Sequence, residues 1–199
     1  MPARDLAHVE GFFRRLGLVR VSLMPPMALW AVYVFINGFV SIGLLALLAV
    51  ITGVPFVFPS LGPTAYQLFF SPLAPSSALR HAFIGHAIGL ICGYLAFRLS
   101  RIPMLLVLAS REFDWRLVLA AALSLAVTAA LMILARVSHA PAGATTLIVS
   151  LGMITQPSHL VVMELAVVVL TLQAFCVNRL AGIPYPVWNE LPPGGLAER

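Results

Sequence analysis

Two short stretches rich in hydroxyl, glycine, proline and histidine residues interrupt an otherwise apolar chain at matching places. The first reads Phe58-Pro59-Ser60-Leu61-Gly62-Pro63-Thr64, and the second reads His139-Ala140-Pro141-Ala142-Gly143-Ala144-Thr145-Thr146. Proline and glycine break helices, and a broken helix inside a membrane exposes backbone N–H and C=O groups. Such breaks often mark transport sites. These two stretches are therefore the candidates for the chemistry of the chain.

In each stretch the extended part comes first and a short helical run follows, so the buried end of each half-helix is predicted to be its N-terminus. A helix N-terminus carries unpaired N–H groups and about half a positive charge, which favours a small anion. The alternative is that these residues only cap the two broken helices against each other. The predicted anion site combines glycines, for close backbone approach, with hydroxyl donors and one imidazole: Ser60, Gly62, Thr64, His139, Gly143, Thr145 and Thr146.

Three titratable residues are candidates for proton coupling: His86, His139 and Glu164. His139 directly precedes the second half-helix, and an imidazole titrates near neutral pH. Glu164 is predicted to lie within a spanning helix, where acids are costly and often functional. The alternatives are packing for His86, capping for His139 and a membrane-interface position for Glu164. The sequence has no metal-ligand spacing and no catalytic constellation, so we expect no metal, no cofactor and no enzyme activity.

The composition identifies an integral membrane protein. Of 199 residues, 61% are hydrophobic and 10% are charged, which is far more apolar than a soluble domain of this size needs. The net charge of +5 comes from arginines, with no lysine in the chain. These arginines lie in short loops that flank apolar runs, where they set membrane orientation, so we do not expect nucleic acid as a partner.

The pattern predicts an all-α fold of four spanning helices and two re-entrant half-helices in two tandem repeats. The predicted N-terminal segment, 1–24, holds an amphipathic helix over 5–20 that Pro25 and Pro26 end. The transmembrane domain covers 25–180, with repeat 1 at about 27–99 and repeat 2 at about 115–180, and an extended surface tail follows at 181–199. The predicted spanning helices cover about 27–52, 81–99, 117–135 and 160–178, and the half-helices about 63–70 and 142–152.

The arginine distribution suggests an orientation for this arrangement. If each broken segment returns to the side from which it entered, ten arginines lie on the side of both termini, and only Arg80 and Arg136 lie on the other. The positive-inside rule then puts both termini in the cytoplasm, most simply at a bacterial inner membrane. On this count the two repeats are expected to be parallel rather than inverted.

The two interrupted stretches, together with Gly85-His86, resemble the HPP family of integral membrane proteins. The resemblance covers about residues 25–180. The His-Pro-Pro motif that names the family reads His139-Ala140-Pro141 here, so its first proline is alanine. The resemblance implies a compact protein of four spanning helices, found in bacteria and plant plastids, and the plastid members are linked to nitrite transport. Some bacterial members carry fused CBS domains, for which this chain lacks the length.

These observations together predict membrane transport of a small monovalent anion, with nitrite or nitrate as the first guess. The alternative is a non-transporting membrane scaffold or sensor subunit. Four helices and two half-helices make a thin wall for a pathway, so a homodimer or higher homo-oligomer in the lipid bilayer is expected.

Overall fold

The computed structural model describes residues 3–18, 23–100 and 115–188, and the regular structure within these ranges is helical. Within these ranges, four helices are long and apolar enough to cross a membrane: α3 (Pro26–Thr52), α5 (Leu79–Ser100), α7 (Trp115–Leu134) and α9 (Pro157–Leu180). Each corresponds to one of the predicted spanning helices. The predicted four-span, all-helical membrane fold is therefore confirmed. The loop 101–114 and the part of the predicted tail beyond Trp188 lie outside the described residues.

Two short helices lie between the spanning helices, as the proline and glycine pattern predicted. These are α4 (Leu61–Phe70) and α8 (Pro141–Ser150), and each has ten residues. At 1.5 Å per residue each is about 15 Å long, roughly half of the hydrocarbon thickness. Pro63 and Pro141 lie in the first turn of their helices, where a proline removes no helical hydrogen bond.

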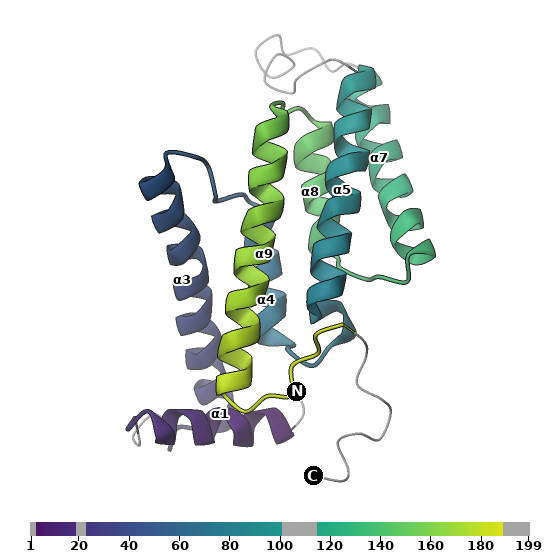
Figure 1. The fold of residues 1–199 in the computed structure, drawn as a ribbon. Helices are drawn as coiled ribbons and strands as arrows, with labels where there is room; N and C mark the ends of the chain where they lie inside the picture. Colours follow the sequence, from purple (N-terminus) through teal and green to yellow (C-terminus); the bar gives the residue numbers. More distant parts are fainter. Residues whose placement is uncertain (1–2, 19–22, 101–114, 189–199) are drawn as a thin grey trace.

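Helix α1 (Ala3–Arg15) lies across the start of α3 at one end of the molecule (Figure 1). Its Val9 and Phe13 side chains are buried, and the Phe12 ring contacts Tyr33 of α3 edge to face. The helix ends at Arg15 rather than near residue 20 as predicted. The reason is Gly17, whose left-handed φ of 74° lets the chain turn and the Leu18 N–H bond back to the Phe13 carbonyl.

The two repeats are inverted, which corrects the predicted parallel arrangement. Helix α3 begins beside the end of α9, where the Tyr33 hydroxyl donates to Oδ1 of Asn178 over 3.0 Å. Helix α5 begins at this same end, and α7 begins at the far end (Figure 1). Because α3 and α5 both run away from the first end, residues 53–78 pass from one end to the other instead of returning. The half-helices are therefore not re-entrant.

The physical reason is the reach of the extended chain before the half-helix. The eight residues 53–60 extend up to about 26 Å, and α4 adds about 15 Å, which together exceed the hydrocarbon thickness. The arginine count was misleading because it assumed a return to the side of entry. Arg80 and Arg136, which it assigned to the opposite side, lie at the end that holds α1, where the Arg80 guanidinium donates to the Ala135 carbonyl over 3.1 Å.

The first part of the C-terminal tail is packed into the protein, so the prediction of a surface-lying segment is wrong for residues 181–187. The Ile183 and Tyr185 side chains are buried. The Tyr185 hydroxyl donates to the carbonyl of Ser77 in the short turn Pro75–Ser77, and the Arg80 N–H donates to the Val187 carbonyl. These apolar side chains and paired backbone groups hold the segment against the start of α5.

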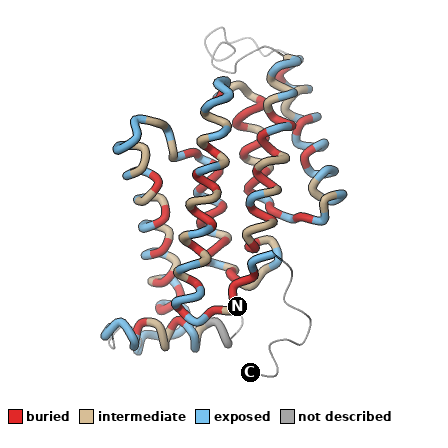
Figure 2. The backbone as a smooth tube through the Cα atoms, viewed as in Figure 1, coloured by how far each residue is buried: buried red, intermediate tan, exposed pale blue. Residues whose placement is uncertain are grey.

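Buried positions concentrate on α4, α8, α9 and one face of α5, whereas much of α3 and α7 is exposed (Figure 2). Exposed apolar faces on α3 and α7 are what lipid contact requires of a membrane protein. The two half-helices lie between these flanking helices (Figure 1).

Candidate functional site

Four side chains meet in the interior and form what we name the hydroxyl–imidazole cluster: Thr64, His86, His139 and Thr145. The Thr64 hydroxyl oxygen lies 2.9 Å from Nε2 of His86 and 3.4 Å from Nε2 of His139. The Nδ1 atom of His86 lies 2.7 Å from the Thr145 hydroxyl. Each of the four residues is at most 1% exposed, so the cluster is closed off in this conformation.

Both half-helices contribute to the cluster, and α5 joins them. Thr64 comes from the first turn of α4 and Thr145 from the first half of α8, while His139 precedes α8 by two residues. The ring centroids of His86 and His139 are 5.0 Å apart. The cluster therefore lies where the N-terminal parts of the two half-helices meet α5.

Glycines on α5 bring α8 close enough for these contacts. Gly85, Gly89 and Gly93 follow one another at four-residue spacing and face α8. A Cβ atom added to Gly89 would lie 2.7 Å from the Ala142 carbonyl oxygen, and one added to Gly93 would lie 2.7 Å from the carbonyl oxygen of Thr146. Small residues at such helix interfaces allow close backbone approach within membranes.

Backbone carbonyls fix the roles of two members of the cluster. The Nδ1 atom of His139 lies 2.9 Å from the Ser76 carbonyl oxygen, which only accepts, so Nδ1 carries the proton of the neutral ring. The Thr64 hydroxyl donates to the carbonyl of Ser60 over 3.0 Å. Tyr185 holds the loop around Ser76 in turn, because its hydroxyl donates to the Ser77 carbonyl. Burial raises the pKa of this phenol, so the hydroxyl keeps its proton.

The N-termini of both half-helices lack a side-chain cap. Ser60 occupies the N-cap position of α4, yet its hydroxyl bonds to no N–H group. This hydroxyl is fully buried and has no hydrogen-bond partner within the described chain. A buried polar atom without a partner is costly, so it marks a position where a bound group could supply the missing hydrogen bond. Backbone carbonyls already accept from the first N–H groups of both half-helices: Leu61 donates to Phe58, and Ala142 and Gly143 donate to His139 and Ala140. The partial positive charge at these helix ends, beside the Ser60 hydroxyl, is what suits an anion.

The predicted anion-site residues divide into two groups in the structure. Ser60, Thr64, His139 and Thr145 lie together, with Ser60 joined to Thr64 through its carbonyl. The structure does not bring the other three to the cluster. Gly62 is exposed with open space around it, Gly143 faces Leu125 of α7, and the Thr146 hydroxyl lies 3.0 Å from that of Thr128 on α7.

The predicted proton-coupling residues also divide. His86 and His139 are members of the cluster, whereas no hydrogen bond joins Glu164 of α9 to it. Both carboxylate oxygens of Glu164 are buried without a hydrogen-bond partner in the described part of the chain. Over that same part, no group of three His, Cys, Asp or Glu side chains lies close enough to hold a metal ion.

Two contributors were not predicted. The Ser76 carbonyl fixes the His139 ring, and Thr128 pairs with Thr146. The Pro75-Ser76 pair opens the short turn before α5, which begins at Leu79, and proline there holds the turn that presents the carbonyl. The sequence around Thr128 does not indicate its role, because single threonines are common in apolar helices. Which neighbour the Thr128 side chain contacts depends on how α7 packs against α8.

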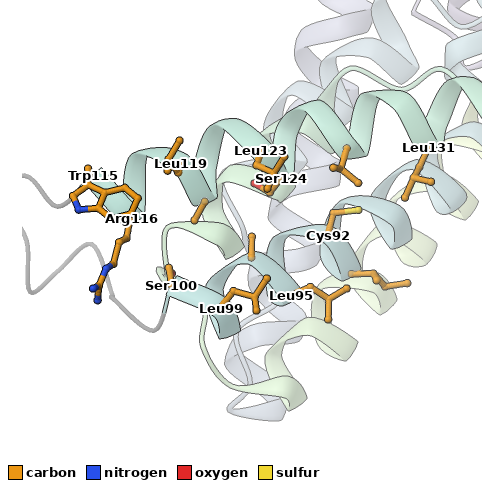
Figure 3. A pocket seen from close by; sticks show the side chains of 14 residues that line it. Cys92, Leu95, Leu99, Ser100, Trp115, Arg116, Leu119, Leu123, Ser124 and Leu131 are labelled. Carbon is orange, nitrogen blue, oxygen red and sulfur yellow. The ribbon is translucent and has the colours of Figure 1, made fainter.

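Among the described residues, two of the cavities lie outside the cluster. One of about 400 Å³ lies between the half-helices and is lined by Pro63, Tyr66, Gln67, Phe70, Ser71, Ala140, Pro141 and Ala144. Pro63, Ala140 and Ala144 in this lining directly adjoin Thr64, His139 and Thr145 in the sequence. The other, of about 430 Å³, lies between α5 and α7 toward the far end of the molecule (Figure 3). Its walls are mainly apolar, with Trp115 and Arg116 at one end, which suits hydrocarbon better than an ion.

No curated protein and no solved structure gives a significant match to this sequence. The family description "HPP, transmembrane region" covers residues 24–186, which include α3 to α9 and the whole cluster. The match therefore includes both half-helices and the cluster they form with α5, and the chain belongs to the HPP family of integral membrane proteins.

Proposed function

We propose that this protein transports a small monovalent anion, nitrite or nitrate first, across a membrane. The observation that carries the proposal is the meeting of two half-helix N-termini, neither with a side-chain cap, beside the orphaned Ser60 hydroxyl and the hydroxyl–imidazole cluster. The positive ends of the two helix dipoles and the buried hydroxyls can replace part of an anion's hydration shell. The pairing of discontinuous helices in inverted repeats supports a transport pathway, since transporters commonly place substrate between such helices.

Anion flux into liposomes that contain the purified protein tests the proposal. Nitrite, nitrate, chloride and formate are compared, with and without a pH gradient, against protein-free liposomes. We expect selective nitrite or nitrate flux. Absence of flux for all four anions, from protein shown to be folded, would favour the scaffold or sensor subunit instead.

A paired substitution tests the site itself. In the double variant Thr64→Val with Thr145→Val, both hydroxyls of the cluster are lost, and we expect nitrate flux to fall at least about tenfold. The matched control is Thr171→Val in α9, a buried threonine whose hydroxyl bonds only within its own helix. Equal flux in the double variant and the control would remove the cluster from the proposed pathway.

The orientation proposed for this protein keeps both termini in the cytoplasm of a bacterium. Among the described arginines with placed side chains, Arg14, Arg15, Arg80, Arg136 and Arg179 lie at the end that holds α1, against Arg98 and Arg116 at the other. The positive-inside rule supports this assignment. Labelling of single cysteines with a membrane-impermeant reagent in intact cells tests it, and labelling at the α1 end from outside would reverse it.

A homodimer is proposed through the exposed face of α4 and the exposed residue that precedes α8. Gly62, Pro63 and Ala140 are exposed near the broken ends of α4 and α8, and irregular backbone at membrane depth needs protein or water rather than lipid against it. The stacked rings of Tyr66 and Phe70 lie on the same face and offer a contact surface.

Crosslinking in membranes tests the dimer. In a background without the two native cysteines, Tyr66→Cys should crosslink between copies. Phe35→Cys, on the exposed apolar face of α3, is the control that should not. Efficient crosslinking only from Phe35→Cys would place the interface between copies at α3. Monomer alone for both Tyr66→Cys and Phe35→Cys would argue against a dimer.

A further inference from the structure

The hydroxyl–imidazole cluster holds one proton fewer than its contacts require. It has four contacts that each need a hydrogen: Thr145 to His86, His86 to Thr64, Thr64 to the Ser60 carbonyl, and Thr64 to Nε2 of His139. With both rings neutral, only three protons serve them, one from each hydroxyl and one from His86. The proton of His139 is committed to the Ser76 carbonyl.

The contact without a hydrogen is the one between Nε2 of His139 and the Thr64 hydroxyl. In the neutral cluster the Thr145 hydroxyl donates to Nδ1 of His86, Nε2–H of His86 donates to Thr64, and Thr64 donates to the Ser60 carbonyl. Nε2 of His139 then faces the Thr64 oxygen with no hydrogen between them, consistent with 3.4 Å, the longest distance in the cluster. A proton added at Nε2 would donate to Thr64 and complete the set.

We propose that one proton binds at Nε2 of His139 for each anion bound at the half-helix N-termini, which makes transport an electroneutral proton–anion symport. This inference rests on the proposed anion transport. On uptake, a proton from water on one side forms the Nε2–H bond while the Nδ1–H bond stays. On release, the Nε2–H bond breaks and the proton leaves with the anion on the other side.

The surroundings of His139 explain why proton and anion must enter together. Helix α5 brings His81 and His86 near the ring, α4 brings the uncharged Thr64, and α8 has no titratable residue. At the end of α7, the nearest charged residue in sequence is Arg136, whose side chain is exposed. Within the described residues, the carboxylate–arginine pair is on α1, between Glu10 and Arg14. A buried imidazolium alone is therefore uncompensated, and an anion beside it removes that cost.

His86 is assigned the role of a positioning residue and proton carrier rather than the binding group. Both of its ring nitrogens are already paired with hydroxyls, so a second proton would have to displace one of the existing donors. Its two bonds also hold Thr64 of α4 and Thr145 of α8 in register across α5. The chain of contacts from Thr145 to His139 can reverse its donor directions without moving a heavy atom, as a proton relay requires.

Proteoliposomes of the full chain test the inference with nitrate, the anion of a strong acid, which does not cross the bilayer as free acid. Nitrate entry and lumen pH are followed together while valinomycin and potassium set the membrane potential. We expect one proton per nitrate and equal rates at zero and at inside-negative potential. For an unpaired anion, an inside-negative potential of about 100 mV would lower the equilibrium accumulation about 50-fold.

The substitution that isolates the proton site is His139→Asn. The Asn amide N–H can replace Nδ1–H toward the Ser76 carbonyl, but the side chain has no counterpart of Nε2. We expect proton-driven nitrate uptake to fall at least about tenfold and the one-to-one ratio to be lost. The control is His159→Asn, outside the cluster at the start of α9, which should keep both rate and ratio.

The outcomes separate the inference from the function beneath it. Nitrate flux in the native chain that depends on potential and carries no proton overturns the symport while transport stands. A His139→Asn protein that keeps one proton per nitrate moves the proton site elsewhere and overturns the assignment. No flux of any anion from folded protein removes the transport function and this inference with it. If His139→Asn does not fold, the ratio and the potential dependence of the native protein still decide.

Discussion

The two half-helices, α4 and α8, reach the same cluster but are held by different forces. Helix α8 has no exposed residue and is packed against the glycines of α5 at distances that leave no room for a methyl group. Helix α4 exposes Tyr66 and Phe70, and its far end is anchored by a polar bond from Nδ2 of Asn178 to the Leu68 carbonyl over 3.2 Å. The comparison teaches that steric fit positions α8, whereas α4 depends more on polar contacts. Substitutions against α8 should therefore affect stability, and those on α4 should affect chemistry.

The largest expected effect comes from filling the α5–α8 contact. Gly89→Ala should destabilise the protein by about 1–3 kcal/mol, because the new methyl group would overlap the Ala142 carbonyl. The control is Gly43→Ala in α3, where nothing lies within 4 Å of an added Cβ and helix propensity predicts a gain of up to about 1 kcal/mol. Thermal unfolding in detergent measures both, and equal melting temperatures would show that α8 is not held by close packing.

The second expected effect separates the hydroxyl of α4 from that of α8. Thr64→Val removes the hydroxyl that contacts the Ser60 carbonyl, His86 and His139, so we expect nitrate flux to fall about tenfold or more. Thr145→Val removes one partner of His86 and should lower flux about threefold. Flux assays in liposomes decide the order. A larger loss for Thr145→Val would place the chemistry at α8.

The third prediction concerns the orphaned hydroxyl of Ser60. Ser60→Ala should leave the free energy of unfolding unchanged or raise it by up to about 1 kcal/mol, since a buried hydroxyl without a partner is removed. It should also raise the nitrate concentration for half-maximal flux several-fold if that hydroxyl binds the anion. Unfolding and flux are measured on the same preparation, and a loss of stability with unchanged nitrate dependence would assign Ser60 a structural role.

The smallest expected effect concerns the polar anchor of α4. Tyr33→Phe removes the hydroxyl that donates to Asn178 and should cost about 0.5–1.5 kcal/mol. Flux per folded molecule should stay unchanged, because Asn178 keeps its bond to Leu68. The measurement is unfolding in detergent beside flux in liposomes. A loss of flux without a loss of stability would mean that this anchor controls the cluster directly.

Several parts of the site were predictable because local chemistry carries them. Pro63 and Pro141 indicate the starts of helices, and the glycine and hydroxyl residues around them indicate breaks in the apolar runs. The facing of individual side chains was not predictable. Thr145 and Thr146 are adjacent in sequence, yet they point about 100° apart on a helix, so one contacts His86 of α5 and the other Thr128 of α7.

The sequence by itself determined the four spanning helices, the two half-helices and the position of the half-helix N-termini, because these depend on run length, hydropathy and local helix breakers. Only the tertiary structure decided that the repeats are inverted and that His86 joins Thr64 to Thr145. The direction in which a broken segment crosses depends on where its extended residues lie, and the pairing of side chains depends on helix rotation and on the close approach that the α5 glycines allow. Neither is encoded in the local pattern of residues.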